Sequence, residues 1–315
     1  MRKLLTQVRA WTAAAGLAAV MPGTLGGELN PFWHDGRPEF SSQTLFEGER
    51  FPNVAVALDG SVLATWGSRA FQVRRSEDGG VTWGPVIEVA RPGFHGGGIT
   101  VDEGSGAILA FVEERHPLAP LTVHRSTDHG RTWRVQETKI LPDSLGQVPA
   151  MHMNERGITL LRGPHAGRLI RATRWYGGGN DRAFWPGHCA NAIYSDDGGK
   201  TWRTSEPFPA RGTGEAAIVE LSDGRLHFNS RRHLATDGRD PRRRHVAWSH
   251  DGGVTWQDLA VSEELPDGDQ SSDYGLMAGL VRLPMDGCDI LLFSNIDSRE
   301  GRRRGTVWAS FDGGQ

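Results

Sequence analysis

Apolar residues of this chain gather in short runs, and polar segments rich in Gly, Asp and Ser separate the runs. Several runs contain or end at D-G or S-G pairs, which are typical of tight turns between strands. No stretch of about 12 residues has the apolar spacing of an amphipathic helix. The pattern therefore predicts an all-β fold of many short strands, among them the runs 53–67, 106–114, 167–176, 216–231, 276–283 and 289–295.

One polar phrase recurs between these runs in the form S-x-D-x-G-x-T-W. Its Ser and Asp oxygens can accept hydrogen bonds from turn N–H groups, its Gly permits a positive φ, and its Thr and Trp begin the next strand. A calcium loop is a weaker interpretation, because the ligand series and final Glu of an EF-hand are missing. We therefore predict a structural role for the aspartates of the phrase, Asp78, Asp128, Asp197, Asp251 and Asp312.

The copies begin at residues 76, 126, 195, 249 and 310, so successive starts are 50, 69, 54 and 61 residues apart. A phrase repeated at roughly 50–60 residues is typical of a β-propeller, with one four-stranded blade per repeat. The fifth copy reaches Gln315 before its expected Thr-Trp pair, so we expect the last blade to be truncated in this chain. Because the phrase caps hairpins at the outer edge of a blade, we expect the ligand site elsewhere, over the central channel.

Composition agrees with this fold, since 11 Trp, 42 Gly and 17 Pro suit short strands and tight turns better than long helices. The formal net charge of −3 gives no reason to expect a nucleic-acid partner. No stretch after the N-terminus approaches the ~20 apolar residues of a membrane-spanning helix. Cys189 and Cys288 are too few for a disulfide scaffold, and they either form one bridge or remain buried thiols.

Residues 1–28 combine a basic start with an apolar, Ala-rich run and small residues. This order is typical of an export signal, although a disordered leader or an added short helix would have a similar composition. We expect residues 1–28 to be a signal peptide or leader and residues 29–315 to form the propeller domain. The protein is then predicted to be secreted or periplasmic.

Other enzyme chemistries find little support in the sequence. Its histidines lack the H-x-x-x-H spacing of a zinc site, and no C-x-x-C pair is present. A G-x-S-x-G elbow and a phosphate-binding loop are also missing. We therefore predict neither a metal nor a cofactor.

The repeated phrase is the Asp-box of sialidases, and three further segments strengthen the resemblance to that family. The segment ERFPNVAVALDGSVLATWG (49–67) resembles the opening strands of the family. It places Arg50 at the position of the first of three arginines that hold the substrate carboxylate in the family. GTGEAAIVELSDGRLHFNSRR (212–232) resembles the segment that contains the family's glutamate and second arginine, here Glu215 and Arg231. LLFSNIDSREGRRRGTVWASFDGGQ (291–315) resembles the segment with the third arginine, here Arg302, with Arg303 as the alternative register.

The resemblance implies a six-bladed sialidase-like β-propeller, truncated in its last blade, that acts as an exo-α-sialidase on terminal sialic acid of glycoconjugates. Its arginine triad would be Arg50, Arg231 and Arg302, and guanidinium suits this task because it binds carboxylate through paired N–H···O contacts and stays charged. Glu215 would polarise a tyrosine nucleophile and accept its proton in a covalent step. The ordinary alternatives are a strand-end acid and solvated or ion-paired arginines.

The nucleophile has no clear counterpart in this chain. In the family the tyrosine lies downstream of the Asp-box that begins here at Ser310, and the sequence ends at Gln315. Of the tyrosines present, we expect Tyr194 in the core. Tyr274, at the start of a predicted strand, is a weak candidate, and Tyr176 is the third.

The acid/base aspartate of the family is also missing, because residues 67–75 contain no carboxylate. Three explanations are open: another acid reaches the glycosidic oxygen, the substrate is different, or the reaction does not need this acid. The candidates in the next blade are His95, Asp102, Glu113 and Glu114. Their ordinary alternatives are a turn residue for Asp102 and an exposed strand-end pair for Glu113 and Glu114.

Two other functions stay open. A non-catalytic Asp-box propeller would bind acidic glycans with the same arginines, and a related hydrolase or lyase would act on another carboxylated sugar. The partner is an acidic glycan in each case, and the sequence does not predict the oligomeric state.

Overall fold

The computed structural model describes residues 7–11, 33–34, 37–38, 42–95, 97–151, 155–234, 238–239, 242–269, 275–285 and 288–314. Strands make up nearly all of the regular structure there, and the only helical segments in these ranges are two 3₁₀ helices, η1 (Gly163–His165) and η2 (Arg182–Gly187). Neither is long and apolar enough to cross a membrane. The predicted all-β fold is confirmed.

Five sheets follow one another along the chain, and we number them blade 1 to blade 5. Blade 1 contains β4 (Asn53–Val56), β5 (Val62–Trp66), β6 (Phe71–Ser76) and β7 (Ile87–Ala90). Blade 2 contains β8 (Thr100–Val101), β9 (Ile108–Glu113), β10 (Leu121–Ser126) and β11 (Arg134–Gln136). Blade 3 contains β13 (Ile158–Thr159), β14 (Leu169–Trp175), β15 (Cys189–Ser195) and β16 (Thr201–Thr204), with β12 (Lys139–Leu141) added parallel to β16.

Blade 4 contains β17 (Thr213–Glu220), β18 (Leu226–Arg232), β19 (Arg243–Ser249) and β20 (Gln257–Pro266). Blade 5 contains β22 (Gly279–Met285), β23 (Cys288–Ser298) and β24 (Gly305–Ser310), with β1 (Gln7–Trp11) parallel to β24 and β21 (Gly268–Asp269) parallel to β23. A separate pair is formed by β2 (Trp33–His34) and β3 (Arg37–Pro38).

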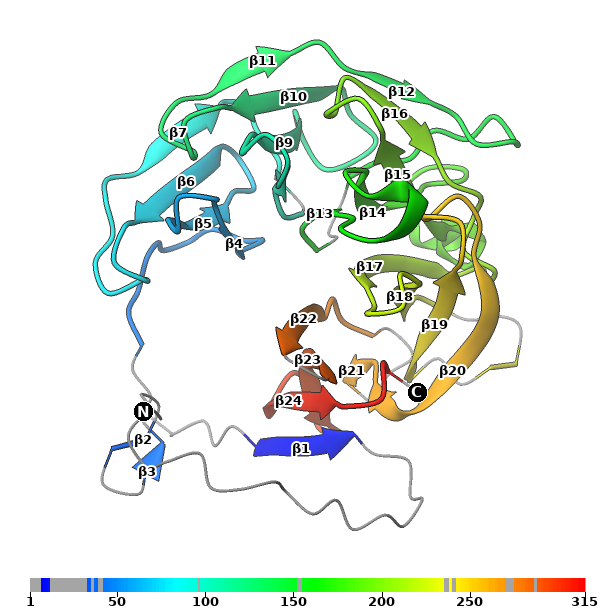
Figure 1. The fold of residues 1–315 in the computed structure, drawn as a ribbon. Helices are drawn as coiled ribbons and strands as arrows, with labels where there is room; N and C mark the ends of the chain where they lie inside the picture. The colour runs from blue at the N-terminus through cyan, green and yellow to red at the C-terminus, as the bar shows by residue number, and fades with distance from the viewer. Residues whose placement is uncertain are drawn as a thin grey trace.

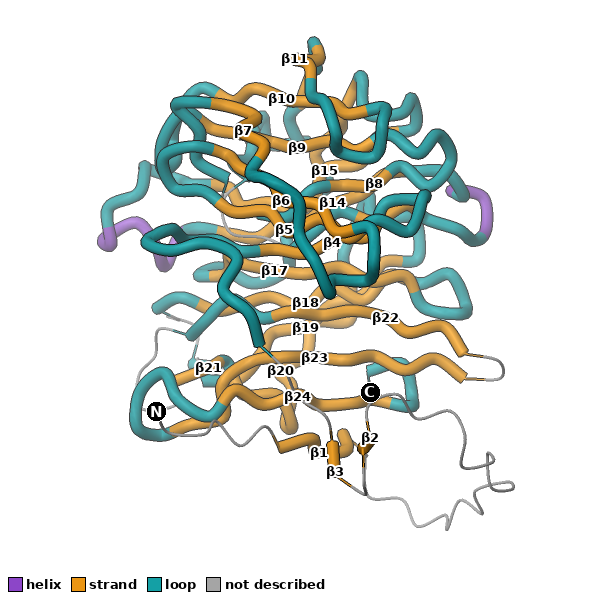
Figure 2. Tube along the Cα trace, turned by 90° about the vertical axis from the view of Figure 1, so that its left-hand side faces the viewer, coloured by secondary structure: helices purple, strands orange, loops and turns teal. Residues whose placement is uncertain are grey.

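The blades succeed one another round an arc, with their inner strands toward its centre (Figure 1). Seen from the side, the strands of neighbouring blades run across the molecule one above another (Figure 2). The described residues thus form five blades in a propeller arrangement. The sixth blade and its truncation stay predictions.

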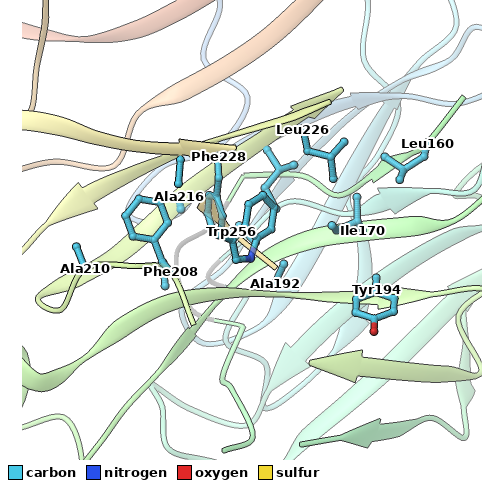
Figure 3. Close-up of a cluster of buried hydrophobic side chains, with 14 residues drawn as sticks. Leu160, Ile170, Ala192, Tyr194, Phe208, Ala210, Ala216, Leu226, Phe228 and Trp256 are labelled. Carbon is cyan, nitrogen blue, oxygen red and sulfur yellow. The ribbon is translucent and has the colours of Figure 1, made fainter. Parts of the chain in front are cut away.

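Hydrophobic cores fill the spaces between neighbouring blades. In β9, Ile108 and Ala110 pack toward blade 1, whereas Leu109 and Phe111 pack toward blade 3. Strand β9 is therefore buried on both faces, since successive side chains of a strand point to opposite sides. The largest cluster lies between blades 3 and 4, where Phe228 and Trp256 contact each other at 4.4 Å between ring centroids (Figure 3).

Each complete Asp-box forms the turn between the third and fourth strands of its blade. In blade 2, the carboxylate of Asp128 accepts hydrogen bonds from the Ser126 hydroxyl (2.8 Å), the Thr132 N–H (2.9 Å) and the Thr132 hydroxyl (2.6 Å). Desolvation opposes the charge of Asp128, but these hydrogen bonds outweigh it and lower the pKa to about 2. The carboxylate therefore holds its turn in the ionised form.

The Asp-box glycines also join each blade to the blade before it. Gly130 has a φ of +82°, and a Cβ atom at this position would collide with Leu63 of blade 1. Gly199 is packed in the same way against Leu109 of blade 2, with a φ of +85°. The Asp-box is thus a contact between blades as well as a turn within one.

Two expectations from the sequence fall partly outside the described residues. Within the predicted leader, 1–28, residues 7–11 form β1 and the other residues are not described, so the export signal stays a prediction. Cys189 is a free, buried cysteine, which answers the question of a bridge for this residue, and the side chain of Cys288 lies outside the described part.

We predict that Asp128→Ala lowers the free energy of unfolding by about 2 kcal/mol at pH 7, because charge-assisted hydrogen bonds contribute about 1.5–3 kcal/mol each before solvent exposure weakens them. The folded-state pKa lies below the ordinary value, so this contribution is present above about pH 4 and is lost as the pH falls toward 2. Thermal unfolding of both proteins from pH 7 to pH 2 measures the effect. Thr127→Ala, an exposed change in the same turn, is the matched control, and an equal loss in both variants would contradict the prediction.

Candidate active site

A cavity of about 930 Å³ lies where connections and strand ends of all five blades meet. We call it the central cavity. It contains every residue that the resemblance assigned to substrate binding or catalysis, namely Arg50, Glu215, Arg231 and Arg302. These positions are up to 252 residues apart in sequence (302 − 50), so the propeller topology alone brings them together.

Glu215 and Arg231 form a buried ion pair on the first two strands of blade 4. Regular pairing of β17 with β18 is interrupted between Thr213 and Ala216, and such bulges redirect side chains beside active sites. Arg231 Nη1 donates to Glu215 Oε2, and only 3–4% of either side chain is exposed. The carboxylate is therefore held against the arginine that it was predicted to accompany.

Arg50 and Arg302 approach the cavity from blades 1 and 5 and are both exposed. The carbonyl oxygen of Arg50 accepts a hydrogen bond from Gly67 N–H at 3.0 Å, and its guanidinium lies 4.5 Å from the centroid of the Phe51 ring. Arg302 lies in the connection that leads into β24. Its neighbour Arg303 is also exposed but does not line the central cavity, which favours the Arg302 register.

Arg174 is a fourth arginine of the cavity that sequence reasoning missed. It lies on β14, and its Nη2 donates to His188 Nδ1 at 2.7 Å. Burial, together with the charge of Arg174, lowers the pKa of His188 to about 4, so the imidazole is neutral and its Nε2–H donates to Gly179 O at 2.9 Å. The available signal was the presence of arginines in the run LIRATRW, which is otherwise mostly apolar.

A second buried ion pair supports the strand that carries Arg231. Arg244 Nη1 and Asp267 Oδ1 are 2.7 Å apart, and neither side chain is exposed. Asp267 also accepts the Arg232 N–H at 2.7 Å, and Arg244 Nε donates to Asn229 Oδ1 at 2.6 Å. This network fixes the β18 backbone on both sides of Arg231.

Comparisons with known proteins show to which family the chain belongs. The family model described as a BNR repeat-like domain matches residues 98–315. A sialidase of Micromonospora viridifaciens is 32% identical to the chain over 349 residues, which cover 96% of this chain and 51% of the relative. The chain belongs to the sialidase family of BNR-repeat proteins.

Two further matches point to the same family. A sialidase of Bacteroides fragilis is 32% identical over 62% of this chain and 33% of its own length. The solved structure of the Hadza microbial sialidase Hz136 is 28% identical, with a TM-score of 0.64, and the match covers 84% of this chain and 57% of that one. The chain spans about half or less of the length of these curated sialidase relatives.

None of the acids suggested to replace the sialidase aspartate lines the central cavity. Asp102 is a turn residue, since its carboxylate accepts hydrogen bonds from Gly104 N–H at 3.0 Å and from Ser105. Glu114 is exposed, as its ordinary alternative predicts. Burial lowers the pKa of His95 to about 3, so it is a neutral core residue.

The ordinary alternative for Glu113, an exposed residue at a strand end, was wrong, because only 2% of it is exposed. Its Oε1 accepts the Met151 N–H at 3.2 Å, and burial raises its pKa to about 7. It lines a separate cavity of about 630 Å³ beside β10 and β12. The connection that leads into blade 3 covers this side chain, which a local sequence pattern does not predict.

The tyrosines do not supply a nucleophile to the central cavity in the described residues. Tyr194 is part of the core between blades 3 and 4, as expected. Tyr176 is buried beside Arg174, and burial raises its pKa. Tyr274 lies outside the described residues.

One carboxyl group of the central cavity was also missed. Glu155 lies in the connection between β12 and β13 and lines the cavity together with Glu215. In the part of the chain that the structure describes, no cluster of three or more His, Cys, Asp or Glu side chains is arranged to hold a metal ion. The cavity therefore offers guanidinium groups to an anion and carboxyl groups for proton transfer.

We predict that Asp267→Ala lowers the free energy of unfolding by about 3–5 kcal/mol, because it leaves the buried Arg244 without its carboxylate. Chemical denaturation measures this loss. The matched control is Glu88→Ala, which removes an exposed ion pair with Arg91 and should cost at most about 1 kcal/mol. Similar losses in the two variants would show that the buried pair does not stabilise blade 4 in this way.

Proposed function

We propose that the protein is an exo-α-sialidase that removes terminal sialic acid from glycoconjugates. The observation that supports this best is the convergence of Arg50, Arg231 and Arg302 with Glu215 on one cavity. Sialic acid has a carboxylate on its anomeric carbon, beside the bond that is broken. Arginines that bind the carboxylate therefore also position that bond.

In the proposed mechanism the substrate carboxylate enters among the guanidinium groups and forms charge-assisted hydrogen bonds with them. Glu215 then accepts the proton of a tyrosine hydroxyl as the tyrosine attacks the anomeric carbon, as in retaining sialidases. A neutral phenol suits this position, because an anionic nucleophile would be repelled by the substrate carboxylate. The tyrosine itself stays a prediction from the resemblance.

The finer predictions of architecture belong to this proposal. A sixth blade would complete the ring between blade 5 and blade 1, which lie at the two ends of the arc (Figure 1). Export by a leader within residues 1–28 would bring the enzyme to extracellular glycans. The Asp-box aspartates, from Asp78 to Asp312, would act in the scaffold and not in catalysis.

A second candidate function is a non-catalytic propeller that binds acidic glycans through the same arginines. The lack of a carboxylate in residues 67–75 favours it, because a sialidase needs a proton donor for the leaving group. A hydrolase or lyase for a different carboxylated sugar is a variant of the first proposal. The reaction of an α-sialoside distinguishes these possibilities.

We predict that the purified protein, expressed from its complete reading frame, releases the fluorophore from a 4-methylumbelliferyl α-sialoside. Arg302→Ala should lower kcat/KM about 100-fold, which corresponds to the loss of a bidentate charge-assisted contact of about 3 kcal/mol. Arg303→Ala is the matched control, because it removes a neighbouring exposed arginine that does not line the cavity.

The other outcomes separate the candidate functions. Equal loss in both arginine variants would contradict the assigned triad. Binding of sialic acid that depends on Arg302, without any turnover, would favour the glycan-binding propeller. Neither binding nor turnover would direct attention to another carboxylated sugar.

A further inference from the structure

Glu155 occupies a position in the central cavity that three blades define. Its Oε2 accepts a hydrogen bond from Asn53 Nδ2 of blade 1 at 3.1 Å. Its N–H donates to the carbonyl oxygen of Ala216 in blade 4 at 3.0 Å, and Ala216 directly follows Glu215. Glu155 is thus fixed beside the proposed base, on the side of the cavity where the Arg50 segment enters β4.

The second carboxyl oxygen of Glu155 points toward blade 5. A Cβ atom placed on Gly279 would lie 3.7 Å from Glu155 Oε1 and 2.6 Å from Ser294 Oγ. Gly279 and Ser294 both line the central cavity. A Cβ atom at 279 would thus crowd Ser294 and reach ordinary van der Waals contact with the Glu155 carboxyl group, which places that group beside the first strand of blade 5.

The surroundings of Glu155 favour the protonated form of its carboxyl group. Burial raises the pKa of Glu155, and the Asn53 hydrogen bond, the Arg156 N–H and the Arg156 charge only partly oppose this effect. The cavity also contains the charged groups Arg50, Arg174, Arg231, Arg302 and Glu215. A neutral carboxyl group can lie near a substrate carboxylate without repelling it.

His116 is the competing proton donor in the same cavity. His116 lies on an exposed connection of blade 2, and its Nδ1 is 2.9 Å from Asn180 Nδ2. Burial lowers the pKa of His116, and the charges of Arg174 and Arg50 act in the same direction. A lowered pKa makes the protonated imidazole less available, whereas the raised pKa of Glu155 favours its protonated form, so the geometry and the directions of the two pKa shifts favour Glu155.

We propose that Glu155 is the general acid and base of this enzyme, in the role for which residues 67–75 supply no carboxylate. This inference rests on the proposed sialidase function. In the first step the Glu155 proton goes to the glycosidic oxygen as its bond to the anomeric carbon breaks. The tyrosine oxygen then bonds to that carbon, its proton goes to Glu215, and the leaving group departs as an alcohol.

In the second step a water molecule attacks the anomeric carbon. Glu155, now a carboxylate, takes one proton of that water, and the tyrosine leaves with the proton held on Glu215. Free sialic acid forms, and both carboxyl groups return to their starting states. The cycle needs no oxidant, reductant or metal.

The test compares Glu155→Gln with the unchanged protein, both from the complete reading frame, on two substrates. Sialyllactose has a poor leaving group and needs protonation, whereas 4-methylumbelliferyl α-sialoside has an activated phenol that leaves without it. We expect kcat/KM for sialyllactose to fall by about 10²–10⁴-fold, the usual contribution of general acid catalysis. For the aryl sialoside, the glycosylation step should fall less than about 10-fold on the same basis.

Three further measurements separate catalysis from folding and binding. The thermal midpoint and the inhibition constant of sialic acid should stay close to those of the parent, and the alkaline limb of the kcat/KM profile should disappear in Glu155→Gln. Glu155→Asp should recover part of the sialyllactose activity. Glu114→Gln, an exposed acid outside the cavity, is the matched control and should leave both substrates unaffected.

Equal loss on both substrates, or no loss on either, would overturn the role of Glu155, and the second result would direct the same test to His116→Gln. Both results require a parent protein that cleaves sialosides. A parent that cleaves neither substrate would instead overturn the proposed function, and the acid role with it. The two failures are therefore distinguishable.

Discussion

Positive charge that converges on one cavity is the constraint on which the rest of this structure depends. Like charges repel strongly where water is excluded, so each buried guanidinium needs a compensating contact. Arg231 is paired with Glu215, whereas Arg174 lies against the neutral ring of His188. Four arginines, Arg50, Arg174, Arg231 and Arg302, thus line the same cavity as two carboxyl groups, Glu155 and Glu215. An anionic ligand would add charge-assisted contacts to those that the protein already makes.

Such a cluster requires a scaffold that does not relax away from it. The Asp-box turns provide part of this rigidity, because Gly130 and Gly199 are packed against the side chains of the preceding blade. Strand β9 is buried on both faces, so a shift of blade 2 would disturb two cores at once. Beneath Arg231, the Arg244–Asp267 pair holds the strand itself. Repeated turns far from the cavity therefore contribute to the position of its arginines.

The sequence predicts the blades well, because the Asp-box has a fixed spacing and the strands between its copies are short and apolar. It does not predict β12. This strand pairs in parallel with β16, which begins 60 positions after β12 ends (201 − 141). Within the site, Arg50, Glu215, Arg231 and Arg302 could be named because each belongs to a recognisable local phrase. Their common location follows from topology alone.

Arg174 and Glu155 were missed for a related physical reason. Arg174 lies in a strand whose pattern indicates only burial, and its role depends on the end of that strand reaching the central cavity. Glu155 lies in a connection without any motif, and its contacts come from three different blades. Glu113 was misplaced in the opposite direction, because a distant connection covers it. Burial of charge is a tertiary property, so these assignments needed coordinates.

The position of Glu155 suggests how a propeller can move a catalytic proton donor from one blade to another. In a closed ring the connections of all blades reach the same central space, so a carboxyl group from any of them can approach the same bond. Asn53 of blade 1 contacts the Glu155 carboxyl group, which ties the proposed donor to the blade that lacks its own acid. The proposed reaction therefore requires a proton donor beside the glycosidic oxygen, but it does not require that a particular strand supplies it. A family motif names the usual source of that proton, whereas the shape and charge of the cavity decide which group can provide it.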